Sequence, residues 1–176
     1  MFDRQPTLQC GAYSLMPLVQ DDRSALGAAA RDPLIWAGHP EQDRYKPAVF
    51  DRLFDTLIGY GGALVLRYND DVIGTSTYYT GSTQPGTIAI GYTFLTRAHW
   101  GGATNRIMKT MMLDHAFQNF DAVWLHIAPS NIRSQKATQR LGAVYSHTED
   151  MQTSLGPCPM QFYVIEKSAW RDRVSE

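Results

Sequence analysis

Apolar residues recur along the chain with the period of a strand or of a helix, and their order predicts alternating elements. The segment "LQCGAYSLMPL" (8–18) is typical of a strand that ends at Pro17. The segment "DDRSALGAAARDP" (21–33) predicts a short helix, capped by one of its two aspartates and stopped by its proline. Residues 48–62 predict an amphipathic helix closed by two glycines, whose apolar face holds Val49, Leu53, Phe54, Leu57 and Ile58.

The remaining pattern predicts a sheet covered by helices. Strands are expected at 63–68, 72–79, 87–95, 122–128, 144–151 and 162–168, and helices over 101–120 and 131–143. The strand, helix and strand around 101–120 predict two parallel strands joined by a crossover. No repeat or linker interrupts the chain. The sequence therefore predicts one domain over 1–176, of the α/β (α+β) class, with a mixed sheet of about seven strands.

Composition narrows the function classes. The 176 residues are 44% hydrophobic and 19% charged, as in globular proteins, and the net charge of -1 gives no general attraction to nucleic acid. Two cysteines, Cys10 and Cys158, make no disulfide framework. The start "MFDRQPTLQC" lacks a signal-peptide run, and no stretch is long and apolar enough for a bilayer. We expect a cytoplasmic protein without nucleic-acid or membrane partners.

The segment "TRAHWGGATNRIMK" (96–109) places two glycines before the long predicted helix. A helix start offers unpaired N–H groups and positive charge, and no carboxylate competes in this first turn. The side chains of Arg97, Arg106 and Lys109 add positive charge around it. Such a turn suits a phosphate or pyrophosphate, although its glycines equally suit close packing of strand and helix. The spacing matches neither the dinucleotide nor the triphosphate motif.

A second turn opens the helix of "APSNIRSQKATQRLGA" (128–143), where Asn131 or Ser130 can cap the first turn. Ser134 shares a helix face with Ala137 and Leu141, which must face the sheet, so Ser134 is expected to point inward. A serine at such a position often only bonds the backbone. The pattern alone leaves open whether Ser134 only bonds the backbone or has a functional role.

Together, the two turns resemble those of the GNAT N-acetyltransferases, above all the branch of the ribosomal-protein-alanine N-terminal acetyltransferases. The resemblance runs through "LMPL", "IGYTFL", "WGGATNRIMK" and "NIRSQKATQRLGA" and covers nearly the whole chain. It implies a twisted, mixed sheet that is splayed open in the middle, with helices on both faces and acetyl-CoA in the split. It also implies acetyl transfer to an amine without a metal, in a family whose members often form homodimers.

The resemblance implies a role for each matching residue. The pantetheine arm of acetyl-CoA would lie along Phe94, Leu95 and Thr96, with Asn131 near its far part. Ser134 would be the catalytic residue that protonates the leaving thiolate. Trp36 and Tyr92 would bind the acceptor amine. The pyrophosphate would bind the turn made by Trp100, Gly101, Gly102, Ala103, Thr104, Asn105 and Arg106.

Two positions depart from the family. Ala103 replaces a usual glycine, and it is small enough to keep the ligand close. Ala89 stands where a carboxylate is common on the central strand, and general-base help is typically worth about a hundredfold. A peptide N-terminus, with a pKa near about 8, needs such help less than a lysine near about 10.4. Water could take the amine proton instead, or one of His39, Glu41 and Asp43 in the 36–45 loop.

The sequence thus predicts an acyl-CoA-dependent N-acetyltransferase that acts on a protein N-terminus or a small-molecule amine by direct attack. The alanine at position 89 leaves open a non-catalytic CoA-binding or interaction module with the same fold. The glycine turn alone would also fit a protein that binds another phosphate ligand. The five histidines show no ligand spacing, so no metal site is predicted.

Overall fold

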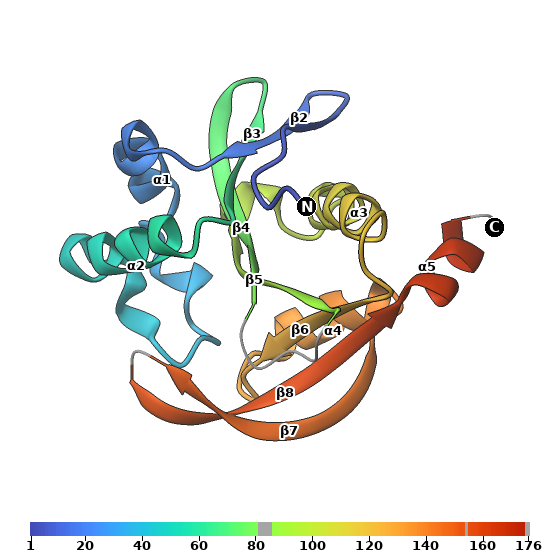
Figure 1. The fold of residues 1–176 in the computed structure, drawn as a ribbon. Helices are drawn as coiled ribbons and strands as arrows, with labels where there is room; N and C mark the ends of the chain where they lie inside the picture. The colour runs from blue at the N-terminus through green and yellow to red at the C-terminus, as the bar shows by residue number, and fades with distance from the viewer. Residues whose placement is uncertain (81–85, 154, 175–176) are drawn as a thin grey trace.

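A single mixed sheet organises the chain in the computed structural model, which describes residues 1–80, 86–153 and 155–174 (Figure 1). Its eight strands are β1 (Leu8–Cys10), β2 (Tyr13–Pro17), β3 (Ala63–Tyr68), β4 (Asp71–Tyr79), β5 (Ile88–Leu95), β6 (Ala122–Ile127), β7 (Val144–Thr153) and β8 (Gly156–Glu166). The α-helices in this part of the chain are α1 (Arg23–Ala29), α2 (Pro47–Tyr60), α3 (Thr104–Ala116), α4 (Ile132–Arg140) and α5 (Lys167–Val174).

The strands are ordered β1-β2-β3-β4-β5-β6-β8-β7, and all neighbours are antiparallel except β5 and β6. The parallel step across α3 is therefore confirmed, as is the predicted mixed sheet. One strand more than expected is present because the predicted strand 8–18 folds back on itself. Gly11 has a φ of 58°, which allows the tight turn that pairs Cys10 with Tyr13.

The split in the sheet lies between β5 and β6. Only two residue pairs join them, Ile88 with Val123 and Ala89 with Trp124. Beyond these pairs the two strands turn apart, as Figure 1 shows. The splayed sheet that the resemblance implies is thus present, and it exposes the inner edges of both strands to a ligand.

Two apolar clusters pack against the sheet. One contains Met108 and Met112 of α3, both fully buried. The other joins α1 and α2 to β3 and to Phe94. The buried face of α2 is centred on Phe50, Leu53, Phe54 and Leu57, with the predicted Val49 and Ile58 at its edges.

The C-terminal segment differs from the sequence prediction. The strand expected over 162–168 ends at Glu166, and α5 begins at Lys167. Trp170 explains the helix, because it is buried against α3 and its indole N–H donates to Asp114 Oδ1 at 2.7 Å. This contact is tertiary and leaves no local trace in the sequence. Within the described ranges, no helix has both the length and the apolarity of a bilayer span.

Candidate active site

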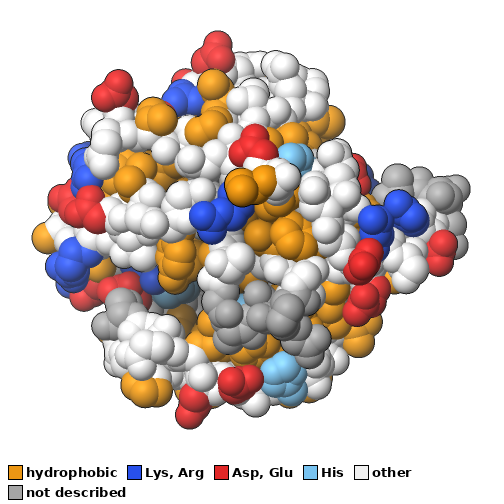
Figure 2. All heavy atoms as spheres, in the orientation of Figure 1, with side chains coloured by type: hydrophobic (Ala, Val, Ile, Leu, Met, Phe, Trp, Pro, Cys, Tyr) orange, Lys and Arg blue, Asp and Glu red, His pale blue; other side chains and the backbone are white. Residues whose placement is uncertain are grey.

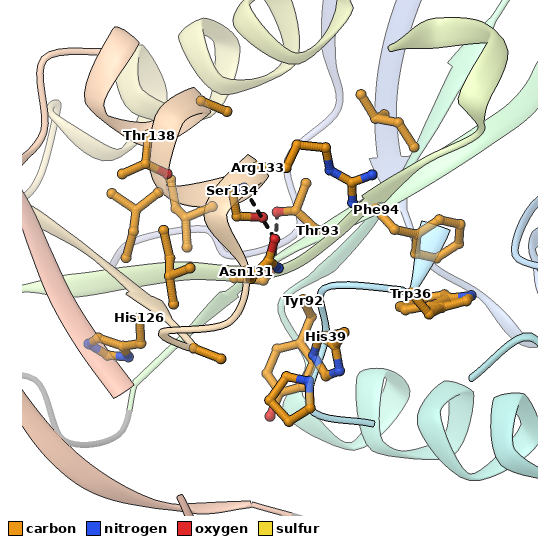
Figure 3. A pocket seen from close by; sticks show the side chains of 18 of the residues that line it. Trp36, His39, Tyr92, Thr93, Phe94, His126, Asn131, Arg133, Ser134 and Thr138 are labelled. Carbon is orange, nitrogen blue, oxygen red and sulfur yellow. Dashed lines mark hydrogen bonds between the residues drawn. The ribbon is translucent and has the colours of Figure 1, made fainter. Parts of the chain in front are cut away.

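A cavity of about 1830 Å³ opens where β5 and β6 diverge (Figure 3). Its walls come from β5, β6, the start of α3 and α4, from α2 and the loop that precedes it, and from residues of β4, β7 and β8. The structure brings most of the predicted site residues to this cavity. Those lining it are Trp36, Tyr92, Phe94, Leu95, Trp100, Gly101, Gly102, Ala103, Asn105, Arg106, Asn131 and Ser134. Thr96 and Thr104 do not line it.

Packing does not explain the glycine turn at the start of α3. A Cβ added to Gly101 or Gly102 would meet no described atom within 4 Å, so neither glycine is needed for close packing of strand and helix. Gly101 has a φ of 73°, a conformation that glycine adopts without strain. None of the described side chains caps the helix, and its first turn holds no acid. The open space and the uncapped N–H groups are the features that an anion site requires.

Neighbouring contacts hold this turn in place. The Trp100 indole N–H donates to Leu95 O at 3.0 Å, and the Arg133 guanidinium lies 3.7 Å from the ring centroid of Trp100. Arg133 also donates to Ile35 O at 3.0 Å, which joins α4 to the segment that precedes α2. Thr104 turns away from the cavity because its hydroxyl bonds the Tyr13 hydroxyl at 3.1 Å. Trp100 and Thr104 are therefore held by contacts on either side of the two glycines.

The start of α4 places a free hydroxyl in the cavity. Asn131 Oδ1 accepts the Ser134 N–H at 3.2 Å, so Asn131 caps the helix, whereas Ser130 donates to Gly38 O at 3.1 Å. Ser134 is half-buried and lines the cavity, as predicted for an inward-facing side chain (Figure 3). Its hydroxyl makes no hydrogen bond with the described residues. It is available to a ligand.

Tyr92 has the most unusual backbone in the site. Its φ of 51° lies in the left-handed region, within a strand and next to a register shift between β4 and β5. For a residue with a bulky side chain this conformation costs roughly 1–2 kcal/mol, and such strain gathers at functional sites. The Tyr92 hydroxyl lies 2.8 Å from that of Tyr60 in α2. Trp36 also lines the cavity, but its indole N–H already donates to Ala30 O at 2.9 Å.

The candidate bases of the 36–45 loop all have partners. His39 Nδ1 accepts the Glu41 N–H at 3.0 Å, and burial and the nearby Arg44 lower the pKa of His39 to about 4. Glu41 pairs with Arg44 at 2.8 Å and Asp43 pairs with Lys46 at 2.9 Å.

The position of Ala89 also bears on whether the site contains a side-chain base. The residue is fully buried between Tyr79 and Trp124 of the adjacent strands, and it does not line the cavity. A carboxylate introduced at this position would have to extend from a buried stretch of β5.

A Tyr79–His126 pair in the cavity wall was not predicted. The Tyr79 hydroxyl lies 2.8 Å from His126 Nδ1, and His126 Nε2 is buried with no partner among the described residues. Burial and the nearby His147 lower the pKa of His126 to about 4, so its imidazole is neutral at pH 7. A neutral imidazole can accept a hydrogen bond from an amine. No local pattern points to this pair, since its members come from different strands.

Lys109 was expected only to add charge around the turn, but its side chain is buried in the cavity wall. Its Nζ donates to Thr93 Oγ1 at 2.7 Å and Ser76 Oγ at 3.0 Å, and these two hydroxyls lie 2.8 Å apart. Burial lowers the pKa of Lys109 to about 7. The helix spacing carries a signal for this placement, since Lys109 precedes the buried Met112, Leu113 and Ala116 by three, four and seven residues.

The family model for the acetyltransferase (GNAT) domain matches residues 14–144. The chain belongs to the GNAT acetyltransferase family. The family resemblance drawn from the two helix-opening turns is therefore confirmed. A search of curated protein sequences finds no match to the chain.

Solved structures agree with this GNAT fold. A GCN5-related N-acetyltransferase from Brucella melitensis is 15% identical, with 95% of this chain and 81% of that chain covered and a TM-score of 0.79. The ribosomal-protein-S5-alanine acetyltransferase from Vibrio fischeri is 16% identical, with 94% and 99% covered and a TM-score of 0.66. The putative acetyltransferase yncA from Salmonella typhimurium, solved with its cofactor acetyl-CoA, is 16% identical, with 89% and 94% covered and a TM-score of 0.61.

Proposed function

We propose that this GNAT acetyltransferase moves an acetyl group from acetyl-CoA to a primary amine, either a protein N-terminus or a small molecule. The observation that carries the proposal is the cavity at the split of β5 and β6, with the open glycine turn of α3 and Ser134 in the same walls. The GNAT structure solved with acetyl-CoA supports this choice of acyl donor. No group of three His, Cys, Asp or Glu side chains within the described ranges is arranged to hold a metal.

The cavity residues fit acetyl-CoA. The uncapped N–H groups at the start of α3, from Gly102 to Arg106, would hold the pyrophosphate in the open space beside the glycines. The backbone of Phe94, Leu95 and Thr96 would bond the pantetheine arm, since it borders the edge of β5 that β6 leaves unpaired. Asn131 would lie near the far part of that arm.

The chemistry would rest mainly on positioning. The amine would attack the thioester carbonyl, while a backbone N–H of the 92–95 strand stabilises the oxyanion. Ser134, whose hydroxyl has no hydrogen-bond partner among the described residues, would protonate the departing thiolate. Tyr92 and the ring of Trp36 would line the acceptor side of the cavity.

Proton removal from the amine is the weakest part of this machinery. The described carboxylates in the cavity wall are Glu41, which is paired with Arg44, and the exposed Asp150. His126 Nε2 could accept a hydrogen bond from the neutral amine, but with a pKa of about 4 it is a poor base at pH 7. The site therefore suits amines that are partly neutral at pH 7, such as peptide N-termini.

The rival proposal is a non-catalytic CoA-binding module, and Ala89 is the observation that favours it. Calorimetry with acetyl-CoA, followed by a thiol-release assay over a panel of amines, separates the two. Binding with turnover supports the transferase, and binding without turnover on any amine supports the module. Absence of binding would contradict both. The homodimer and the cytoplasmic location stay predictions.

A further inference from the structure

Lys109 forms a polar cluster with Ser76 and Thr93, and the proposed acetyl transfer does not use it. The lysine is 5% exposed, and Ser76 is fully buried. A lysine ammonium has three N–H donors, and two of them go to the hydroxyls of Thr93 and Ser76. The third has no partner among the described residues. Leaving a buried charged donor unpaired is costly, so the arrangement suggests a missing acceptor.

The missing acceptor is expected to be an anion. No described carboxylate forms an ion pair with Lys109, so its charge is not balanced by any residue that the structure describes. Lys109 and Thr93 both line the cavity, and Figure 3 shows Thr93 pointing into it, as Asn131 and Ser134 do. The anion would therefore reach the cluster from the cavity.

The position of the cluster indicates which ligand carries this anion. Lys109 lies on α3, whose start is the proposed pyrophosphate site, and Thr93 immediately precedes the proposed pantetheine residues. The proposed acceptor residues Trp36 and Tyr92 pack in the cluster formed with α1 and α2, which also contains Phe94, whereas Lys109 projects from α3 to Ser76 and Thr93. Lys109 thus approaches from the side of the sheet that is covered by α3. A carboxylate at Lys109 would belong to the acyl-CoA rather than to the amine.

We propose that Lys109 and Thr93 form a subsite for a carboxylate at the end of the acyl chain. The protein would then prefer acyl-CoA thioesters of short dicarboxylic acids, such as succinyl-CoA, to thioesters with a neutral acyl chain. This inference rests on the proposed acyl transfer and refines its donor. The transfer itself is unchanged: the amine nitrogen forms a bond to the acyl carbon and the carbon–sulfur bond breaks. The nitrogen loses one proton and the departing thiolate takes up one, so the products are an amide and a free thiol.

The test compares two donors of equal chain length. Succinyl-CoA and butyryl-CoA differ at the end of the acyl chain, where a carboxylate replaces a methyl group. Calorimetry on the wild-type protein should show at least tenfold tighter binding of succinyl-CoA. Lys109→Met should abolish this preference, and Thr93→Val should reduce it. The matched control Lys46→Met removes an exposed lysine and should leave the preference unchanged.

Several results would overturn the inference. Equal or tighter binding of butyryl-CoA by the wild type would do so even if a variant failed to fold. So would a Lys109→Met variant that folds and keeps the preference. If Lys109→Met instead raised the KM only for acceptors that carry a carboxylate, the subsite would belong to the amine. Turnover without any donor preference would leave the proposed transferase intact, whereas no binding of any acyl-CoA would remove the transferase as well.

Discussion

Replacing Lys109 with methionine should stabilise the fold, and the gain should be larger at low pH. Burial lowers the pKa of Lys109 to about 7, against 10.5 for an ordinary lysine. The unfolded chain therefore binds more protons than the folded chain between these two values. The cost of charging Lys109 is fully present below pH 7 and disappears as the pH approaches 10.5. Methionine fills the same space without this charge.

The magnitude follows from the two pKa values. Between pH 6 and pH 9, the difference in unfolding free energy between Lys109→Met and wild type should shrink by roughly 2–3 kcal/mol. The loss of the hydrogen bonds to Ser76 and Thr93, each worth about 1 kcal/mol, shifts the difference at every pH and leaves its slope unchanged. Histidines with lowered pKa values are present in both proteins and cancel.

Urea denaturation followed by tryptophan fluorescence at pH 6, 7.5 and 9 measures this difference. Lys46→Met is the control, since Lys46 is exposed and its pairing with Asp43 raises its pKa, so it stays charged throughout. Its difference from wild type should not vary with pH. If the difference in unfolding free energy between Lys109→Met and wild type is also the same at every pH, the reasoning is refuted, because Lys109 would then titrate like an exposed lysine.

Three further predictions concern the proposed transfer. Gly102→Val puts a side chain into open space, and residue 102 does not have a left-handed backbone, so the fold should persist. Calorimetry should show that the affinity for acetyl-CoA falls at least tenfold, which corresponds to about 1.4 kcal/mol. Unchanged affinity would mean that the pyrophosphate binds elsewhere. Ser134→Ala should lower kcat more than it raises the KM for acetyl-CoA, because a proton donor acts on the developing thiolate, and an unaltered kcat would leave Ser134 without a catalytic role. The rate at fixed amine concentration should rise with pH up to the pKa of the amine itself. Peptide N-termini should be acetylated faster than lysine side chains. A plateau well below that pKa would reveal a side-chain base, and His126 would be the first to test.

The parts of the fold that the sequence predicts are those with a strong local pattern. The amphipathic face of α2 and the buried stripe of α3 repeat with the helix period, and both helices lie where expected. The sequence did not predict the chain reversal at Gly11 or the helix α5, for two different reasons. A glycine inside a strand pattern does not reveal a full reversal, and α5 depends on the contact of Trp170 with Asp114, far away in the sequence.

The same division holds for the site. The glycine turn and the Asn131 cap are backbone motifs of a few adjacent residues, so the sequence shows them directly. The structure adds that the two glycines border open space, which the sequence left undecided. The Lys109 contacts join residues 16 and 33 positions apart, and the Tyr79–His126 pair joins two strands. Such groups exist only once the sheet has assembled, and so does the strained backbone of Tyr92.

The central claim is that the chain transfers an acyl group from acyl-CoA to an amine. The most direct measurement incubates the protein with acetyl-CoA and a panel of peptides with free N-termini, and follows the peptides by mass spectrometry and the released thiol in parallel. The account predicts N-acetylated peptide in equal amount to the thiol, with both falling in Gly102→Val and Ser134→Ala. Firm acetyl-CoA binding with neither product nor thiol, across peptides and small amines alike, would contradict it and favour the non-catalytic module.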